Sequence, residues 1–191
     1  MIDRPYLGTT AFIDPQMVRI FMVCEKPPEK AEDYFYSSSD SLYVKNTVDA
    51  FNSAGIKVMD INDIISRGVY LTIAVKTPVK ETPVPIGIIR EQSRILEMEL
   101  KMFPNIKAIL LMGDTAIKAL NCIALNSKKA RIVPAGPTYK IRKGEFFYNG
   151  IRVFPSYLQT GKNFLIEKSK RQMVAEDIRN AFNLLEDGQT G

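Results

Sequence analysis

Four short, predominantly apolar runs set the strongest constraint on how this chain can fold. They are Val18–Cys24, Val69–Val75, Lys107–Met112 and Ile151–Phe154. A run of this length without regular polar alternation is typical of a strand that is covered on both faces, as in a parallel sheet. Proline or glycine follows each run within a few residues, as expected where a strand ends.

Segments with helical periodicity separate these runs. Helices are predicted over Ser41–Ala54, over Ile88–Phe103, from Gly113 through Leu120, and over residues 164–186. Asp114 or Thr115 is placed to cap the third helix. Lys140–Arg142 and Phe146–Tyr148 could form a short hairpin around Gly144. This alternation predicts an α/β fold with three α/β/α layers around a central, mostly parallel, four-stranded sheet.

The length of 191 residues fits one domain. Residues 1–191 are expected to form that domain, with 1–16 as an N-terminal extension and 187–191 as a frayed tail. The N-terminus lacks the apolar core of a signal peptide, and no apolar run approaches the length of a membrane span. We therefore expect a cytoplasmic protein that does not bind membranes.

Strand polarity predicts where a ligand would bind. In parallel α/β sheets, ligands bind beyond the carboxyl ends of the strands. Four loops leave those ends in this sequence: Glu25–Glu29, Lys76–Lys80, Gly113–Thr115 and Pro155–Asn163. A pocket should therefore form from these four segments.

The sequence contains no histidine, and this excludes several kinds of chemistry. Neither a Ser-His-Asp triad nor a histidine-ligated metal can form. Cys24 and Cys122 are too few for a cysteine-based zinc or iron–sulfur site within one chain, and we expect both to be reduced and buried. Residues 24–29 read CEKPPE, which is neither a dinucleotide fingerprint nor a P-loop. No metal and no cofactor are expected.

Positive charge gathers in the second half of the chain. The formal net charge is +5, and no acid lies between Asp114 and Glu145. That stretch holds seven basic residues: Lys118, Lys128, Lys129, Arg131, Lys140, Arg142 and Lys143. A one-sided basic surface suits a polyanion such as DNA. A solvated surface in a mildly basic protein explains the same charges equally well.

Five segments occur in an order that is typical of one family. They read FMVCEKPP at 21–28, VYLTIAVK at 69–76, AILLMGDTAIKAL at 108–120, IRKGEFFYNG at 141–150 and RVFPSYLQTGKN at 152–163. Together they resemble the uracil-DNA glycosylase superfamily, particularly its bacterial and archaeal branches, over about residues 18–186. The resemblance implies the glycosylase fold, DNA as partner, and removal of a damaged or deaminated base during DNA repair.

The resemblance also implies roles for individual residues. Glu25 matches the acid that holds or polarises the attacking water. Ile73, beside Thr72, takes the place of the base-reading asparagine, and Leu158 takes the place of the histidine that stabilises charge on the departing base. Further residues are implied by their positions. The base-binding set is Phe35, Tyr36, Thr72, Ile73, Tyr157 and Leu158, with Tyr34 as a third candidate for the stacking ring. The DNA-binding set is Gln159, Thr160, Lys162, Phe164, Lys128, Lys129, Arg131, Lys140, Arg142 and Lys143.

Each of these residues also has a purely structural interpretation. Glu25 can be a solvated acid, and Ile73 can be a core residue. Phe35 and Tyr36 can be aromatic side chains that pack under a loop. Phe164 or Leu165 can simply start the terminal helix. Three hypotheses follow: a divergent DNA glycosylase, a non-catalytic relative that binds nucleic acid or a nucleobase, and a module that binds a protein or small ligand. Loss of one hydrogen-bond donor to the charge that develops on the departing base lowers the rate by roughly 10²–10³. A leucine at position 158 therefore predicts slow or altered turnover.

Overall fold

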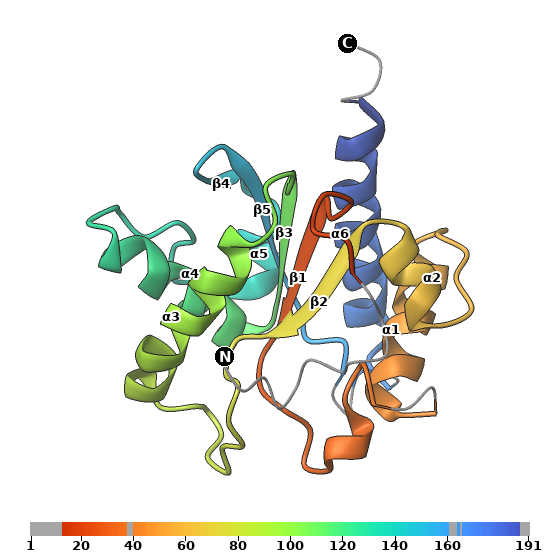
Figure 1. Cartoon of the computed structure of the whole chain (residues 1–191), viewed down its shortest axis with the longest axis horizontal. Helices are drawn as coiled ribbons and strands as arrows, with labels where there is room; N and C mark the ends of the chain where they lie inside the picture. The colour runs from red at the N-terminus through yellow and green to blue at the C-terminus, as the bar shows by residue number, and fades with distance from the viewer. Residues whose placement is uncertain (1–12, 38–39, 161–163, 165, 188–191) are drawn as a thin grey trace.

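The fold is built on one five-stranded sheet with the strand order β2-β1-β3-β5-β4 (Figure 1). The computed structural model describes residues 13–37, 40–160, 164 and 166–187. The strands are β1 Ile20–Cys24, β2 Val69–Ile73, β3 Ala108–Met112, β4 Phe146–Tyr148 and β5 Ile151–Ser156. The first three and β5 are parallel, and β4 pairs antiparallel with β5. The four predicted strands are confirmed.

The strands meet in a register that aligns their carboxyl ends. Cys24 lies opposite Ile73, and Met112 lies opposite Ser156. All residues of β1, β2 and β3 are buried, because helices cover both faces of the sheet. The loops that follow β1, β3 and β5 therefore leave from one edge, hereafter the carboxyl edge of the sheet.

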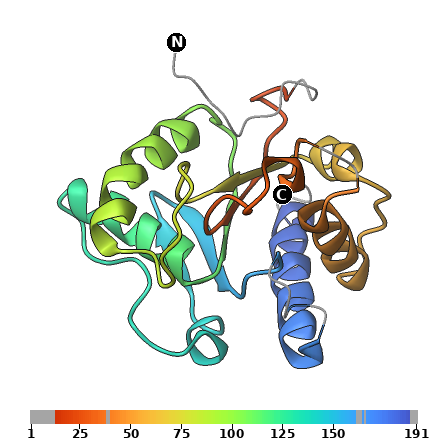
Figure 2. The same cartoon turned by 90° about the horizontal axis from the view of Figure 1, so that it is seen from below.

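Helices form a layer on each side of the sheet, which confirms the predicted α/β class (Figures 1 and 2). Helices α1 Leu42–Ser53, α2 Ile61–Ser66 and α6 Lys168–Asp187 cover one face. Helices α3 Ile86–Lys101 and α4 Asp114–Asn126 cover the other. Alternate residues of β1 enter the two cores, with Met22 and Cys24 on the α1–α6 side and Phe21 and Val23 on the α3–α4 side.

The fifth strand corrects the predicted count of four. The segment expected to pair around Gly144 divides differently, because Thr138–Ile141 forms the short helix α5. Phe146–Tyr148 pairs instead with β5. The turn between them is Asn149-Gly150, with φ angles of 50° and 81°. Asparagine and glycine tolerate such angles and favour a two-residue hairpin turn.

Helix boundaries follow local capping chemistry. The predicted helix over Ser41–Ala54 is α1, and Ser41 caps it, with its Oγ accepting a hydrogen bond from the backbone nitrogen of Val44 at 3.1 Å. The short helix α2 was not predicted from its periodicity, but Asp60 caps it by the same geometry. The terminal helix starts at Lys168 and not at residue 164. No helix in the described part of the chain has the length and hydropathy needed to span a membrane.

Candidate functional site

A cavity of about 780 Å³ opens at the carboxyl edge of the sheet. Its walls come from the loops after β1, β3 and β5, from the first turn of α1, and from the segment leading into α6. Three of the four predicted loops thus contribute, while residues 76–80 do not line it. The volume falls in the usual range for small-ligand sites, about 300–1,000 Å³.

Glu25 joins the end of β1 to the start of α4. Its Oε1 accepts a hydrogen bond from the backbone nitrogen of Thr115 at 3.1 Å. Asp114 and Thr115 were predicted to cap this helix, but the N-cap position is Gly113, and no side chain at that position supplies a capping bond. Glu25 therefore satisfies a free amide of the helix from a neighbouring strand, where the helix dipole favours a negative charge.

Gly113 is required at this junction for two reasons. Its φ angle of 105° lies in a region that side-chain-bearing residues rarely adopt. A Cβ atom at this position would also meet Glu25 Oε1 at 2.4 Å. The glycine thus lets the Glu25 side chain lie flat against the backbone between β3 and α4.

The environment of Glu25 favours its protonated form. Burial raises the pKa of the Glu25 carboxyl above its usual value, and the hydrogen bond from Thr115 partly opposes this effect. The nearby Asp114 raises it further. A carboxyl group whose pKa moves toward neutrality is suited to exchanging protons with a substrate or a water.

The structure brings five of the predicted site residues together at this cavity. Glu25, Tyr157, Leu158, Thr160 and Phe164 all line it. Phe164 is buried, while Tyr157 and Leu158 are half-buried. The cavity therefore has one carboxylate and a largely apolar wall at the positions that the family resemblance implied.

Four predicted base-binding residues lie outside the lining of this cavity. Ile73 is fully buried in the α1–α6 core. Phe35 is also buried, and the Tyr36 hydroxyl donates to the carbonyl of Leu71 at 2.8 Å. The hydroxyl of Thr72 donates to Glu99 Oε2 at 3.0 Å, on the other side of the sheet. These side chains therefore pack in the core or form hydrogen bonds within the fold.

Gln159 is fully buried behind the cavity and makes internal contacts. Its Nε2 atom donates to Cys24 Sγ at 3.1 Å and to Thr47 Oγ1 at 3.4 Å. This amide therefore links β1, α1 and the loop after β5. Lys162, predicted to contact DNA, lies outside the described residues.

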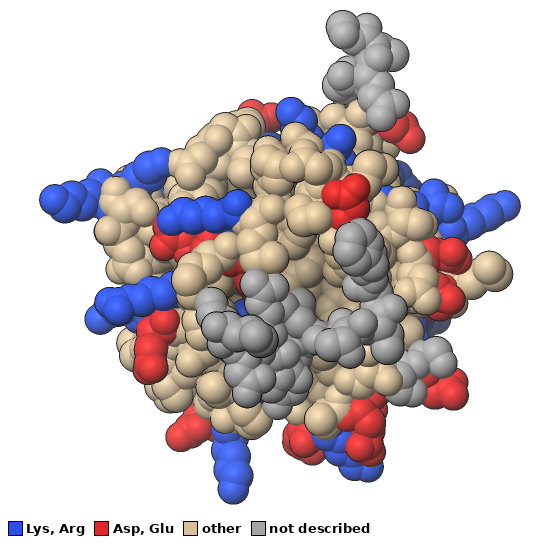
Figure 3. All heavy atoms as spheres, in the orientation of Figure 1, with Lys and Arg blue, Asp and Glu red and all other residues tan. Residues whose placement is uncertain are grey.

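The members of the basic stretch have different surroundings in the structure. Lys129 donates to Asn149 Oδ1 at the amino end of β5, away from the carboxyl edge, and Lys128 is its neighbour. Arg131 lines a second cavity, and Lys140 lies 5.7 Å from the ring of Tyr139. Lys143 is exposed. On the face that Figure 3 shows, basic and acidic side chains are interspersed.

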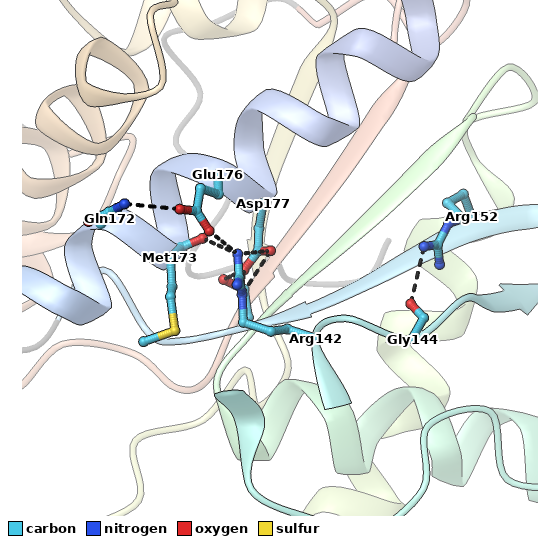
Figure 4. Close-up of polar contacts among 8 residues, drawn as sticks. Arg142, Gly144, Arg152, Gln172, Met173, Glu176 and Asp177 are labelled. Carbon is cyan, nitrogen blue, oxygen red and sulfur yellow. Dashed lines mark hydrogen bonds and ion pairs between the residues drawn. The ribbon is translucent and has the colours of Figure 1, made fainter. Parts of the chain in front are cut away.

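Arg142 turns inward and joins three elements (Figure 4). Its guanidinium contacts Asp177 at 2.8 Å and Glu176 at 3.0 Å, both on α6. The Ser156 hydroxyl at the end of β5 donates to the same Asp177. The Arg142 side chain is only 8% exposed, so this cation serves the fold and does not face a ligand.

Acidic side chains outnumber basic ones around the carboxyl-edge cavity. The acids in its lining are Glu25, Glu29, Asp33, Asp114 and Glu167, and the bases are Lys26 and Lys170. The Lys26 ammonium donates to the carbonyls of residues 79 and 81, and Lys170 pairs with Glu167 at 2.6 Å. By formal charge, the lining of this cavity is therefore negative.

These acids do not form a metal centre. Within the described ranges, no three His, Cys, Asp or Glu side chains lie close enough to hold a metal ion.

Two residues that line the cavity were not predicted from the sequence. They are Leu42 and Tyr43, in the first turn of α1. Their helix was predicted, but its first turn carries no motif that links it to the carboxyl edge.

No protein-family model matches this chain, and no curated protein matches it. The chemistry of the cavity therefore has to identify its ligand. Its lining holds Glu25 with a raised pKa, four further acids, two lysines, two tyrosines and apolar side chains around a space of about 780 Å³.

Proposed function

We propose that this protein hydrolyses the N-glycosidic bond of a damaged or deaminated, uracil-like base in DNA, as a divergent glycosylase of cytoplasmic DNA repair. The observation that supports this most strongly is the cavity at the carboxyl edge. Glu25 lines it together with Tyr157 and Leu158, which the family resemblance places around the base, and with Phe164, which the resemblance places against the DNA. A flipped nucleotide would present its planar base to these side chains.

Glu25 would carry the chemistry in this proposal. In its ionised form, Glu25 accepts a proton from a water molecule while the water oxygen bonds to C1′ of the sugar. The bond between C1′ and the base nitrogen breaks, and its electron pair leaves with the base, which takes up a proton from solvent. Proton transfer by a positioned side chain contributes typically 10²–10⁴-fold to rate.

Slow turnover is expected because the departing base meets an apolar side chain. Leu158 lines the cavity and has no hydrogen-bond donor to stabilise negative charge on the base. Loss of one such donor costs roughly 10²–10³ in rate. The proposed enzyme should therefore act slowly, and best on bases that leave easily.

The first prediction tests the role of Glu25. Oligonucleotides containing uracil, hypoxanthine or xanthine are incubated with the protein in single- and double-stranded form, and abasic sites are then cleaved with alkali. Strand cleavage should fall at least about 100-fold in Glu25→Gln, because the amide keeps its oxygen near Thr115 but cannot accept the water proton. Glu186→Gln, an exposed change at the far end of α6, should leave cleavage unaltered. Equal cleavage by Glu25→Gln and the wild-type protein would refute the mechanism.

A second candidate function is binding of a nucleobase or nucleoside without hydrolysis. It is favoured by the acidic side chains around the cavity and by the engagement of Glu25 with α4. Both features suit an uncharged ligand better than a phosphate chain. Calorimetric binding of free bases to the wild-type protein, without cleavage of any oligonucleotide, would select this function over the first.

A further inference from the structure

A second cavity, of about 370 Å³, lies between α3, α4 and the segment 131–141. Asn121 of α4 fixes one wall of it. The Asn121 side chain donates to the carbonyl of Val133 at 2.9 Å and accepts from the backbone nitrogens of Ile132 and Val133 at 2.9 and 3.0 Å. The irregular segment is thereby held against the helix, so the cavity is preformed and not a gap between loose loops.

Two arginines from different elements line this cavity. Arg90 belongs to α3 and Arg131 to the segment after α4. Neither guanidinium is within ion-pairing distance of a carboxylate among the residues that the structure describes. The lining also contains Asp114, but the Lys118 ammonium lies 2.5 Å from its carboxylate and neutralises it. The cavity is therefore lined by two cations that have no carboxylate partner among the described residues.

Cys122 of α4 lies in the same lining as both arginines. Burial raises the pKa of its thiol, while the positive charges of Arg90 and Arg131 both lower it. Arg90 and Arg131 thus line one cavity from two elements, α3 and the segment after α4.

The second cavity adjoins the cavity at the carboxyl edge. Asp114 and Thr138 line both of them. The lining of the first has more acids than bases, and the second is lined by two arginines without a carboxylate partner in the described part of the chain. A ligand with a neutral base and a separate anionic group matches this division of charge.

We infer that the second cavity binds a phosphate group of the nucleic-acid strand whose base enters the first cavity. Arginine forks match the oxygens of a phosphate in paired hydrogen bonds, and two arginines line this cavity. The assignment of the base rests on the proposed function. Arg90 and Arg131 are phosphate-binding residues in this arrangement and take no part in breaking the glycosidic bond.

A binding experiment on undamaged DNA tests this inference. The affinity of a fluorescein-labelled single-stranded oligonucleotide without a modified base is measured by anisotropy as a function of salt. The double variant Arg90→Gln/Arg131→Gln should bind about tenfold more weakly or worse than the wild-type protein. The slope of log affinity against log salt should fall by about 0.7 for the lost phosphate contact. Arg94→Gln is the matched control, because Arg94 is exposed one turn further along α3 and does not line the cavity.

Three outcomes would overturn the inference. They are unchanged binding by the double variant, an equal loss in Arg94→Gln, and binding of a nucleoside monophosphate as tight as that of the oligonucleotide. The base-excision assay separates this inference from the proposed function. Arginine-dependent binding without excision supports the phosphate site alone, whereas excision without arginine dependence supports the glycosylase alone.

Discussion

At the scale of single residues, Glu25 has two roles that compete for one carboxylate. It caps α4 through the backbone nitrogen of Thr115, and it faces the cavity at the carboxyl edge. Gly113 allows both, because any side chain there would displace Glu25. The position of Glu25 is therefore set by the fold before any ligand binds, which reduces the cost of arranging it for chemistry.

The burial of Glu25 makes stability depend on pH in a defined direction. The folded protein raises the pKa of this carboxyl above its ordinary value of 4.5, so the folded state holds the proton more tightly than the unfolded chain does. The resulting stabilisation is fully present below pH 4.5 and is lost as the pH rises through the folded-state pKa. Glu25→Gln cannot ionise and should therefore gain free energy of unfolding relative to the wild-type protein between pH 4 and pH 7.

Urea unfolding of both proteins at the two pH values measures this gain. Glu186→Gln, which removes an exposed carboxylate, controls for the change in net charge. The wild-type protein could instead gain stability over Glu25→Gln as the pH rises. That result would show that the folded state favours the ionised form of Glu25, so that folding lowers the pKa of this carboxyl and does not raise it.

At the scale of elements, Arg142 connects the short helix α5 to α6 and, through Asp177, to the end of β5. Its guanidinium and the Asp177 carboxylate are 8% and 2% exposed. Removing one partner of a buried ion pair leaves an uncompensated charge and costs about 3–5 kcal/mol. We expect Arg142→Ala to lower the free energy of unfolding by that amount, as measured by chemical denaturation.

Lys143 provides a matched control beside it. Lys143 is exposed, so Lys143→Ala should change stability by less than about 0.5 kcal/mol. A double-mutant cycle with Asp177→Asn tests whether the cost comes from the pair, because Arg142→Ala should cost less once Asp177 has lost its charge. An unchanged cost in that background would assign the effect to packing of the arginine stem.

The same segment shows what sequence patterns can and cannot predict. The strands were predictable because their apolar runs are continuous, and α1 because its apolar residues recur with helical spacing before Gly55. Arg142 was expected to face DNA, since it lies in a stretch that has several basic residues and no acid. Its partners lie on α6, more than 30 residues away, and no local pattern reports such a contact. The turn at Asn149-Gly150 did carry a local signal for the hairpin that the sequence interpretation placed around Gly144.

At the scale of the whole molecule, strand polarity was the most informative signal for the site. It predicted that the loops after the strands would meet, and three of them line the carboxyl-edge cavity. It could not predict which side chains turn toward the cavity. Ile73 faces the core because side chains alternate along a strand, and Phe35 packs beneath the cavity loops.

The shared sheet also determines how the molecule should unfold. Neighbouring residues of β1 enter opposite cores, so neither helical layer can leave without exposing the central strand. Cys24 reports on the α1–α6 core, where burial raises the pKa of its thiol to about 12 and keeps it unreactive. In Cys122→Ser, which leaves Cys24 as the single thiol, labelling of Cys24 in guanidinium should have the same midpoint as the loss of far-UV circular dichroism. Labelling at a lower guanidinium concentration would instead show that the layer of α1, α2 and α6 separates from the sheet before the rest of the domain unfolds.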